Sequence, residues 1–468
     1  TVKGMIAFAC GCNLDIDKRL ELSGKVMWTS IIMWSLSNLL APRLRLAVPG
    51  DVVCFKINKD NPYLIVAGLR TGQVIMWDLS DKNINGEDVY ANMKAAEDTG
   101  GSSVDSKTST PSFSCKATSV LQVSHSRSVS DLQWLPKGVT ITRKGKYQMN
   151  PEAKAPQFFA TVSADGFMYF WDVKLKETHN ADGTVDKNLR WGPTYKLAIA
   201  QDGAKMNLSG KKFTFLTGDD NQTRMVVVTQ AGQVAFGNFA MLPTDDGKVE
   251  AVERFSKSHS LSCVAVEQSP HFPDIVLTVG DWSFSLWKKG CTEPLFTSAC
   301  APAYLTVGCW SPTRPGLLVL GRSDGILDIW VLIDQIHKPV LHRTVRANTE
   351  VSSISFWHGH SKQQLLAVGD FTGTLHIFSV PRILMRPANH EEREMRNWYD
   401  HEVERLKYVE KREASRPEVK TEKKEAKKKD EKAPTKEQIL DGKESAYQEL
   451  LKVFKEQLCP DEEKEERK

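Results

Sequence analysis

A short phrase recurs along this chain and constrains its fold more than any other feature. In each copy a Gly stands five residues before an aromatic residue that closes an apolar run. The clearest copies are RTGQVIMWDL (Arg70–Leu79), SADGFMYFWDV (Ser163–Val173), GRSDGILDIWVL (Gly321–Leu332) and DFTGTLHIFSV (Asp370–Val380). Gly between two apolar runs supplies the positive φ of a tight hairpin. Each copy therefore predicts a strand, a turn and a closing strand.

The spacing of the closing aromatic residues indicates how these strands are arranged. Trp34 and Trp77 are 43 residues apart, as are Trp287 and Trp330. A period in the forties is typical of β-propellers, in which each repeat forms one sheet and the sheets stack around an axis. Seven closing strands can be counted, so we predict an all-β fold: a seven-bladed β-propeller followed by a C-terminal α-helical extension.

We expect the propeller to occupy residues 1–385. The segments GMIAFACG (Gly4–Gly11) and TSIIMWSL (Thr29–Leu36) resemble the last two strands of a first blade that is incomplete at its N-terminus. The chain starts within this pattern, so we expect it to be a piece of a longer polypeptide. Because Trp77 and Trp171 lie more than two repeat lengths apart, we expect insertions at about 81–116 and 137–156.

The C-terminal part changes from strand to helix periodicity. Residues 386–413 are predicted to form an amphipathic helix, 414–434 a charged Lys/Glu linker, and 435–468 a second amphipathic helix and tail. The apolar face of the first helix comprises Met395, Trp398, Tyr399, Val403, Leu406 and Val409. That of the second comprises Leu440, Tyr447, Leu450, Leu451, Phe454 and Leu458.

Composition excludes some classes of function. The formal net charge of +4 is too small to require nucleic acid as a partner. The charges of the linker alternate in sign without aromatic residues, which favours a solvated spacer over a nucleic-acid arm. No apolar run reaches the length of a membrane helix, and no secretory signal is visible. The nine cysteines are scattered, which is typical of reduced thiols.

No group of residues predicts a catalytic, cofactor or metal site. Ser209–Phe213 (SGKKF) is the nearest match to a phosphate loop, but it lacks the upstream Gly, and Lys212 replaces the Ser or Thr that would bind magnesium. Cys10 with Cys12, and His358 with His360, have no second pair at ligand spacing. We therefore expect no cofactor, and a protein that is not an enzyme.

His125 and Asp131 allow two interpretations. They are six residues apart and could form an acid–base pair, but in a propeller such groups more often hydrogen-bond Ser, Thr and Trp to lock a blade, and His259 is expected to act in the same way. We favour the structural role. The closing aromatic residues are likewise predicted to pack between blades; they are Trp34, Trp77, Trp171, Trp287, Trp330 and Phe378.

Two regions are predicted to contact a partner. Trp282 occupies the position where the turn Gly of the fifth blade is expected, and a turn Trp has few neighbours within its own blade. The helical faces are the other region, with Trp398, Tyr399, Val403, Leu406, Tyr447, Leu450, Leu451 and Phe454 as the candidate contacts. These faces can either fold back on the propeller or pair with another chain, and the sequence leaves both possibilities open.

Several segments together resemble a known family. They are FKINKDNPYLIVAGLRTGQVIMWDL (Phe55–Leu79), HSRSVSDLQWLPKG (His125–Gly138), FFATVSADGFMYFWDVK (Phe158–Lys174), SPHFPDIVLTVGDWSFSLWKKG (Ser269–Gly290) and HEVERLKYVEKRE (His401–Glu413). The chain resembles the WD-repeat intermediate chains of dynein, and most closely the axonemal type of the two-headed inner arm, dynein f. The resemblance extends from Thr1 to about Glu413, and it identifies the predicted fold as a WD-repeat propeller.

The resemblance implies a non-catalytic scaffold that binds the N-terminal tail of a dynein heavy chain during motor assembly. The implied partners also include a second intermediate chain and light chains of the same arm, the latter through an N-terminal extension that precedes these residues. The implied location is the cytoplasm and cytoskeleton, in the axoneme of a cilium or flagellum. Neither a membrane nor nucleic acid is an implied partner.

Two other classes were weighed against this hypothesis. A WD-repeat adaptor of another complex, such as a ubiquitin-ligase receptor or a chromatin scaffold, is the first. Ligase receptors often have Arg two residues after the Trp-Asp pair, where this chain has Ser80 after Trp77-Asp78 and Lys174 after Trp171-Asp172. An enzyme that uses the central channel is the second, and only the fold supports it.

Overall fold

The computed structural model describes most of the chain in detail. The described residues are 5–9, 11, 16–21, 29–36, 40, 42–80, 112–143, 145–150, 155–174, 191–200, 208–218, 223–239, 252–358, 363–416 and 436–458, with side chains given for 440–454 of the last segment. Two compact units can be distinguished, Thr1–Asp400 and His401–Lys468. Each unit is described separately below.

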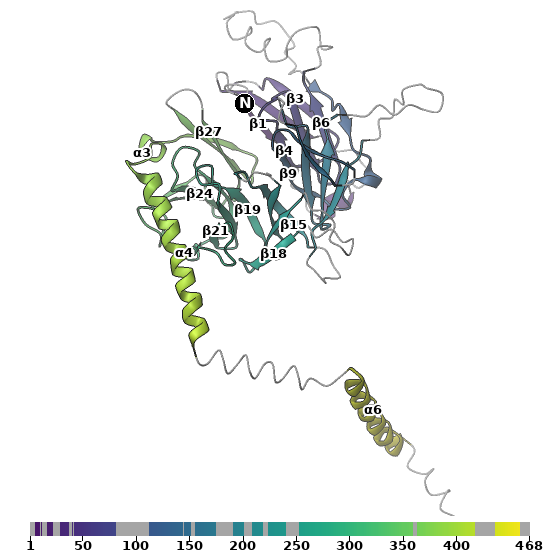
Figure 1. Ribbon diagram of the computed structural model, residues 1–468. Coiled ribbons are helices and arrows are strands. Elements are labelled where there is room, and N and C mark those ends of the chain that lie inside the picture. Colours follow the sequence, from purple (N-terminus) through teal and green to yellow (C-terminus); the bar gives the residue numbers. More distant parts are fainter. Residues whose placement is uncertain are drawn as a thin grey trace, which may run out of the picture. The chain divides into compact units, whose positions relative to one another are not determined.

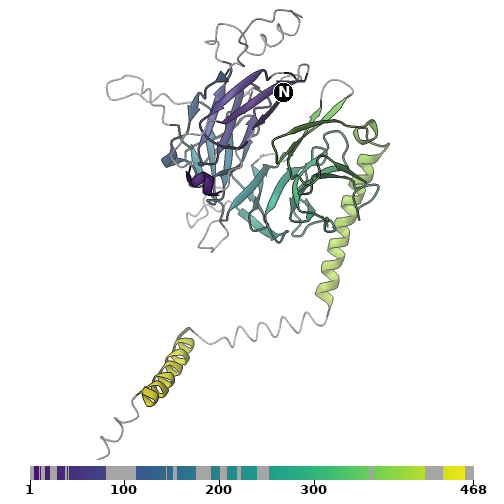
Figure 2. The ribbon, with the colours of Figure 1, turned by 180° about the vertical axis from the view of Figure 1, so that it is seen from behind.

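The first unit is a seven-bladed β-propeller, as predicted. Its sheets follow one another around the unit in chain order, from purple through teal to green (Figure 1). Seen from behind, the first sheet and the last come next to one another around the ring (Figure 2).

The first four blades contain most of the departures from a regular repeat. Blade 1 comprises β1 (Met5–Ala9), β2 (Thr29–Ser35), β3 (Leu44–Val48) and β7 (Ser112–Phe113). Blade 2 comprises β4 (Val52–Ile57), β5 (Leu64–Leu69), β6 (Val74–Asp78) and β8 (Ala117–Thr118). Blade 3 comprises β9 (Val129–Trp134), β12 (Phe158–Ser163), β13 (Phe167–Asp172) and β14 (Tyr195–Ala198). Blade 4 comprises β15 (Gly210–Phe215), β16 (Arg224–Thr229), β17 (Gln233–Asn238) and β18 (Val252–Lys257).

The last three blades are close to the regular repeat. Blade 5 comprises β19 (Cys263–Gln268), β20 (Ile275–Gly280), β21 (Ser283–Lys288) and β22 (Phe296–Thr297). Blade 6 comprises β23 (Leu305–Trp310), β24 (Leu317–Arg322), β25 (Ile326–Val331) and β26 (Leu341–Thr344). Blade 7 comprises β27 (Val351–His358), β28 (Gln364–Asp370) and β29 (Leu375–Ser379). The second strands β5, β12, β20 and β24 are buried along their whole length, because neighbouring blades cover both faces.

Blade 1 differs from the two strands predicted for it. Leu44–Val48 adds a third strand to β1 and β2, and β7 pairs with it in parallel, with Leu46 opposite Phe113. Part of the expected insertion at 81–116 thus serves as an edge strand, while residues 81–111 lie outside the described residues. The second expected insertion contains a hairpin of β10 (Val139–Ile141) and β11 (Tyr147–Met149).

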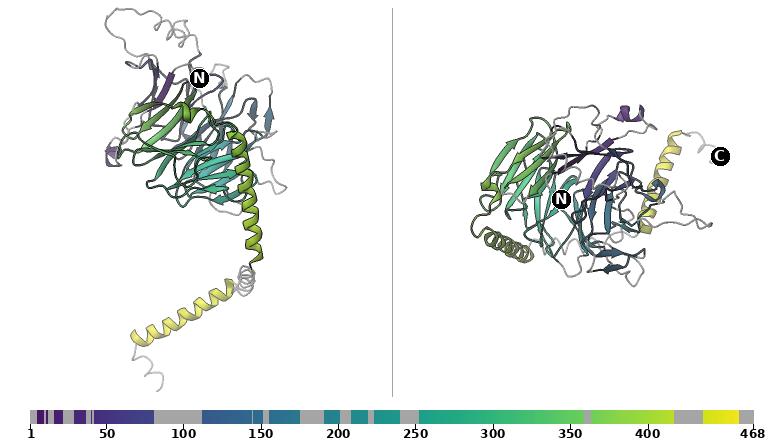
Figure 3. Two further views of the ribbon diagram at one scale, coloured as in Figure 1. Left: turned by 90° about the vertical axis from the view of Figure 1, so that its left-hand side faces the viewer. Right: turned by 90° about the horizontal axis from the view of Figure 1, so that it is seen from above.

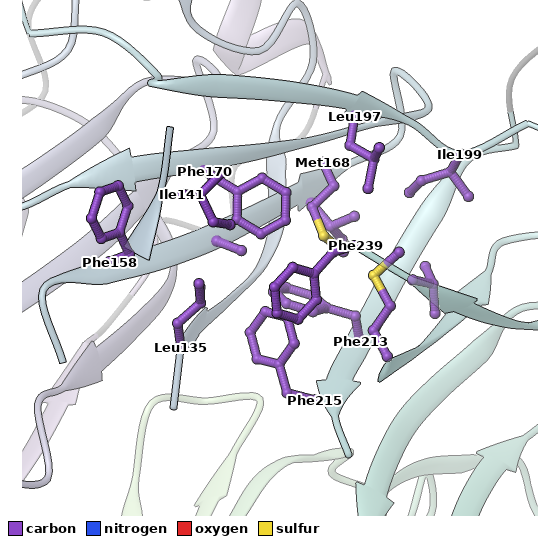
Figure 4. Close-up of a cluster of buried hydrophobic side chains, with 14 of the residues drawn as sticks. Leu135, Ile141, Phe158, Met168, Phe170, Leu197, Ile199, Phe213, Phe215 and Phe239 are labelled. Carbon is purple, nitrogen blue, oxygen red and sulfur yellow. The ribbon is translucent and has the colours of Figure 1, made fainter. Parts of the chain in front are cut away.

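The core lies between blades rather than within them. A cluster between blades 3 and 4 shows this arrangement (Figure 4), and its labelled members come from both sheets and from β10. Blade 4 has Gly237 where a closing Trp is expected, and Phe239, just after β17, packs there on Phe170 at a ring distance of 5.7 Å. A different aromatic residue of blade 4 therefore packs against blade 3.

The hairpin turns require residues that tolerate positive φ. Gly72 has a φ of 88°, and a Cβ atom there would lie 2.1 Å from the carbonyl oxygen of His125 in blade 3. In blade 5 the turn between β20 and β21 contains only Asp281 and Trp282, and Asp281 has the positive φ, at 54°. Trp282 was expected at the position of the turn Gly, but the residue with the left-handed backbone conformation is Asp281, one position earlier.

Helices follow the last blade. The short α3 (Arg382–Met385) precedes α4 (Glu391–Ser415), and α6 (Lys436–Leu458) belongs to the second unit. The short α1 (Ile16–Glu21) and the 3₁₀ turn Leu121–Val123 complete the described helices. The boundary between the two compact units falls within α4, after Asp400. None of the described helices combines the length and apolar character needed to cross a bilayer.

A pair of Gly substitutions separates backbone conformation from packing between blades. Gly290 also has positive φ, at 87°, but a Cβ atom there meets nothing within 4 Å. We expect Gly290→Ala to cost roughly 1–2 kcal/mol for the left-handed conformation alone. Gly72→Ala should cost at least about 1 kcal/mol more, because its methyl group overlaps the neighbouring blade. Urea titration measures both losses, and equal losses would contradict the proposed contact.

Candidate functional site

A hydrogen-bonded chain of side chains in blade 3 involves the first sequence candidate, His125. Its Nδ1 lies 2.9 Å from Asp165 Oδ2, and its Nε2 lies 2.9 Å from Thr161 Oγ1. The indole Nε1 of Trp171 donates to the same Thr161 oxygen at 2.9 Å. His125 is 1% exposed, and its ring stacks on Tyr169 at 4.0 Å. All four polar side chains are engaged with one another, which is the arrangement of a blade lock rather than of an open acid–base pair.

The carboxylate that hydrogen-bonds His125 belongs to Asp165 and not to Asp131. Although burial raises the pKa of Asp165, hydrogen bonds from His125 and from backbone N–H groups hold it below the usual range. Asp131 instead links two inner strands: its carboxylate accepts from Lys212 Nζ at 3.2 Å and from the backbone N–H of Phe213 at 3.3 Å. The negative charge of Asp131 raises the pKa of Lys212 despite burial of the amine.

Blade 5 repeats the His, Thr and Trp part of this arrangement, but there no carboxylate among the described residues hydrogen-bonds the imidazole. His259 Nε2 lies 3.3 Å from Thr278 Oγ1, which also accepts from Trp287 Nε1 at 3.0 Å. Asp281 accepts from the backbone N–H groups of Ser260 and Leu261 and so holds the preceding loop against the turn. Burial lowers the pKa of His259, and the charge of Asp281 offsets this decrease only in part. The lowered pKa favours the neutral imidazole, as expected for a structural residue.

The closing aromatic residues differ in burial according to their blade. Trp77, Trp171, Trp287 and Trp330 are at most 5% exposed, and each packs on the blade before it. Phe378, in the last blade, is half-buried and packs against the cluster between blades 6 and 7. Trp34 is also half-buried and stacks on Phe8 of its own blade at 5.1 Å.

The described residues contain no metal-binding or phosphate-binding geometry. Groups of three or more His, Cys, Asp or Glu side chains at ligand distances are absent from them. Cys10, Cys12 and His360 lie outside the described residues, so the weak metal candidates cannot be placed as pairs. The phosphate-loop candidate Ser209–Phe213 forms the start of strand β15, where Lys212 pairs with Asp131.

The turn of blade 5 presents a small aromatic surface, the Trp282 patch, which consists of Leu261, Trp282 and Tyr304. Trp282 is 42% exposed and Leu261 is 50% exposed. The rings of Trp282 and Tyr304 meet edge to face at 5.7 Å. Asp281 fixes the Leu261 loop beside the turn. The patch is thus held in place while its apolar surface remains accessible.

The first ten residues of α4 pack against blades 5 and 6 through a buried ion pair. Arg314, in the loop before β24, donates from Nε to both carboxylate oxygens of Glu391 at 2.9 Å. Glu391 is 1% exposed, and its Oε2 also accepts from the backbone N–H of Ala388 at 2.7 Å. The ion pair therefore fixes both the start of α4 and the segment that leads into it.

Aromatic contacts continue this packing up to Asp400. Tyr399 is 2% exposed, and its ring meets Phe272 edge to face at 5.4 Å. Trp398 is half-buried and lies against Phe296 at 5.9 Å. Lys288 donates to Asp400 at 2.8 Å. Tyr399 was predicted to contact a partner, but it is covered by its own chain and offers no surface. The apolar face of the first ten residues of α4 therefore folds back on the propeller. This is the first of the two alternatives that the sequence left open.

The remaining helical candidates belong to the second unit. Val403 and Leu406 of α4 are half-buried. In α6, the side chains of Tyr447, Leu450 and Phe454 are each more than 60% exposed, and Leu451 is 38% exposed. Together with Leu440 they form what we call the α6 stripe. Within this unit, the α6 stripe is an apolar helix face that remains open to solvent.

Sequence reasoning missed Arg314 and Glu391. The two residues are 77 positions apart, one in a loop and one in a helix that reads as solvated on that face. A lone Arg beside Pro315 gives no local sign that it will be buried. Only the tertiary structure brings the two side chains together.

Comparison of the sequence with known proteins shows the family to which the chain belongs. The sequence model described as "Dynein axonemal intermediate chain 3 WD40 domain" matches residues 1–190 and 175–380. The chain is 29% identical over 496 aligned positions to dynein axonemal intermediate chain 3 of Homo sapiens, with 90% of this chain and 54% of that protein covered.

More distant relatives carry related names. The chain is 21% identical to the "Dynein, 70 kDa intermediate chain, flagellar outer arm" of Chlamydomonas reinhardtii, over 82% of this chain and 56% of the relative. It is 23% identical to the "Dynein intermediate chain 3, ciliary" of Heliocidaris crassispina, over 81% of this chain and 53% of the relative. The chain thus spans about half the length of these curated relatives.

The buried ion pair gives a stability prediction. Glu391→Gln should destabilise the packing of α4 by roughly 3–5 kcal/mol, because it leaves the Arg314 charge buried without its counter-ion. Hydrogen exchange of the backbone amides from Met395 to Asp400 measures the loss. The control is Glu392→Gln, whose 65% exposed side chain makes only an i,i+4 pair with Arg396 and should cost no more than about 0.5 kcal/mol. Equal protection of these amides from hydrogen exchange in both variants would refute the role of the ion pair.

The turn of blade 7 gives a pH prediction. Burial raises the pKa of Asp370, but hydrogen bonds from Thr372, Thr374 and His376 outweigh it and lower the pKa to about 2. A folded-state pKa below the unfolded value stabilises the protein at neutral pH, and this contribution disappears as pH falls from about 5 towards 2. The stability difference between wild type and Asp370→Asn should therefore shrink over that range in urea titrations. A difference that stays constant with pH would contradict this assignment.

Proposed function

We infer the function from one premise, which is that the chain belongs to the family of the dynein axonemal intermediate chain 3 WD40 domain. We propose that it is a non-catalytic intermediate chain, a scaffold that binds the N-terminal tail of a dynein heavy chain during assembly of an axonemal motor. Its proposed location is the axoneme of a cilium or flagellum, where the motor drives motility. The single observation that carries this proposal is the family match across almost the whole propeller.

The geometry of the polar groups supports a scaffold. In blade 3 the imidazole of His125, which was weighed as half of an acid–base pair, hydrogen-bonds Thr161 inside the blade, and His259 makes the equivalent contact with Thr278 in blade 5. Asp131 and Lys212 similarly connect β9 with β15. Groups that are committed to such contacts stabilise a rigid ring, and a rigid ring offers a partner a preformed surface.

The Trp282 patch is the proposed contact on the propeller. Its exposed indole stands on the turn between β20 and β21. Asp281 of the same turn holds the loop that carries the exposed Leu261 side chain. Aromatic side chains that are exposed yet held in place are common anchors of protein interfaces. An apolar side chain from a helix of the heavy-chain tail is the expected occupant.

The α6 stripe is the proposed second contact. An amphipathic helix whose apolar face is open to solvent can bury that face in a groove of a partner. Residues 417–435 connect it to α4, and such a connection raises the effective concentration of the second contact once the first has formed. Two modest contacts can thereby give tight binding.

We further propose that the arm is an inner arm of the dynein f type, because Ser269–Gly290 with its turn Trp282, followed by the helical extension, is the most specific part of the resemblance. The relatives named above include an outer-arm chain, so the arm type goes beyond what the family match supports by itself. A second intermediate chain and light chains are proposed as further subunits, with light chains bound through residues outside this sequence.

The proposal is tested by recovery of the heavy chain. Leu450→Glu/Phe454→Glu in the tagged 468-residue chain, expressed in ciliated cells, should reduce heavy-chain recovery from axonemal extracts at least tenfold, since two charges would have to be buried. The matched control is Ser445→Glu/Lys452→Glu, on the polar face of the same helix. Heavy-chain recovery is quantified by mass spectrometry. Unchanged recovery with the first variant would remove the α6 stripe from the proposal, and absence of heavy chain with wild type would overturn it.

A further inference from the structure

An open hollow lies beside blade 6 and is lined by residues of α3 and of the segment that leads into α4. Figure 1 labels α3 and α4, and Figure 3 shows the same part of the chain from the side and from above. Its volume is about 400 Å³. The lining residues are Arg314, Asp334, Arg382, Ile383, Arg386 and Ala388. We call it the Arg386 hollow. It lies wholly within the first unit, and none of its lining residues was assigned to the contacts proposed above.

The Arg386 hollow has an excess of positive charge. Arg314 is neutralised by Glu391. Arg382 and Arg386 are exposed, and among the described residues neither has an acidic partner. Asp334 is the single carboxylate in the lining. Guanidinium groups bind carboxylates in a bidentate geometry, so this charge favours an acidic ligand.

The hollow also exposes an apolar side chain on the segment that carries its two free cations. Ile383 is 81% exposed and stands in α3 next to Arg382 and three residues before Arg386. Single exposed apolar residues are ordinary on protein surfaces. Here, however, the apolar group and both cations are side by side on one short segment, so a ligand that pairs with the cations would also cover Ile383.

The backbone around the hollow is fixed before any ligand binds. Arg314 Nη1 donates to the carbonyl oxygen of Ile383 at 3.3 Å, and Glu391 Oε2 accepts from the N–H of Ala388 at 2.7 Å. The same buried ion pair therefore holds both ends of the segment that carries Arg382 and Arg386. A preformed site loses less conformational entropy on binding.

We propose that the Arg386 hollow binds an acidic, amphipathic segment of a partner protein. Two carboxylates of the segment pair with Arg382 and Arg386, and an apolar side chain between them covers Ile383. The backbone N–H of Arg386, which follows α3, donates to the carbonyl oxygen of Arg382 at 2.9 Å, so the two residues are one turn apart and carboxylates one helical turn apart match this spacing. A nucleic-acid strand fits less well, since none of the lining residues is an aromatic on which a base could stack.

Selection from a random library of 16-residue peptides displayed on phage, against the full 468-residue chain, tests this directly. We expect enrichment of peptides with two acidic residues three or four positions apart and an apolar residue between them. The consensus peptide is then synthesised with a fluorescent label and titrated by anisotropy. Arg382→Glu/Arg386→Glu should weaken its binding at least tenfold, Ile383→Ser at least threefold, and added salt should weaken it further.

The matched control is Lys407→Glu/Arg412→Glu, which makes the same change in net charge at exposed positions of α4. It should leave peptide affinity within twofold of wild type. Because the substituted side chains of all three variants are largely exposed, circular dichroism should show the same fold. Enrichment of peptides without acidic pairs, no enrichment at all, or equal binding to the Arg382→Glu/Arg386→Glu variant would each overturn the proposal. So would displacement of the peptide by a 20-nucleotide single-stranded RNA at a lower concentration than by unlabelled peptide.

Discussion

Burial of an aromatic ring of each blade against the blade before it is the constraint on which the rest of the structure depends. Trp77, Trp171, Trp287 and Trp330 are nearly inaccessible to solvent, and each ring is shared between two sheets. No blade can bury its own apolar faces alone, so each is stable only in contact with its neighbours. Blade 4 follows the same constraint with a different residue, since Phe239 packs against blade 3.

Polar side chains inside the blades serve this packing. Thr161 accepts from Trp171 and lies beside His125, and Thr278 accepts from Trp287 and lies beside His259, so the indole N–H groups of Trp171 and Trp287 are satisfied within their blades. These side chains are thereby committed to contacts within the blades. A rigid interior and fixed surface turns are properties that a scaffold subunit requires.

The helical extension has two parts with different roles. Its first ten residues are covered by blades 5 and 6, where Glu391 neutralises Arg314 and Tyr399 meets Phe272. The same ion pair holds Ile383 and Ala388 and so shapes the Arg386 hollow. Residues from His401 onwards form a separate unit, in which the α6 stripe is exposed. The first compact unit consequently includes the part of α4 that packs on the propeller.

The sequence by itself determined the repeat, the number of blades and the periodicity of the helices, because these depend on local patterns: a Gly in a turn, an aromatic residue five positions later, and apolar residues at helical spacing. Only the tertiary structure decided which charged groups pair. Asp131 binds Lys212 and not His125, Asp281 takes the positive φ beside Trp282, and Arg314 meets a Glu391 that is 77 residues away. Such pairings depend on how distant blades and helices meet, and neither composition nor spacing along one strand records this.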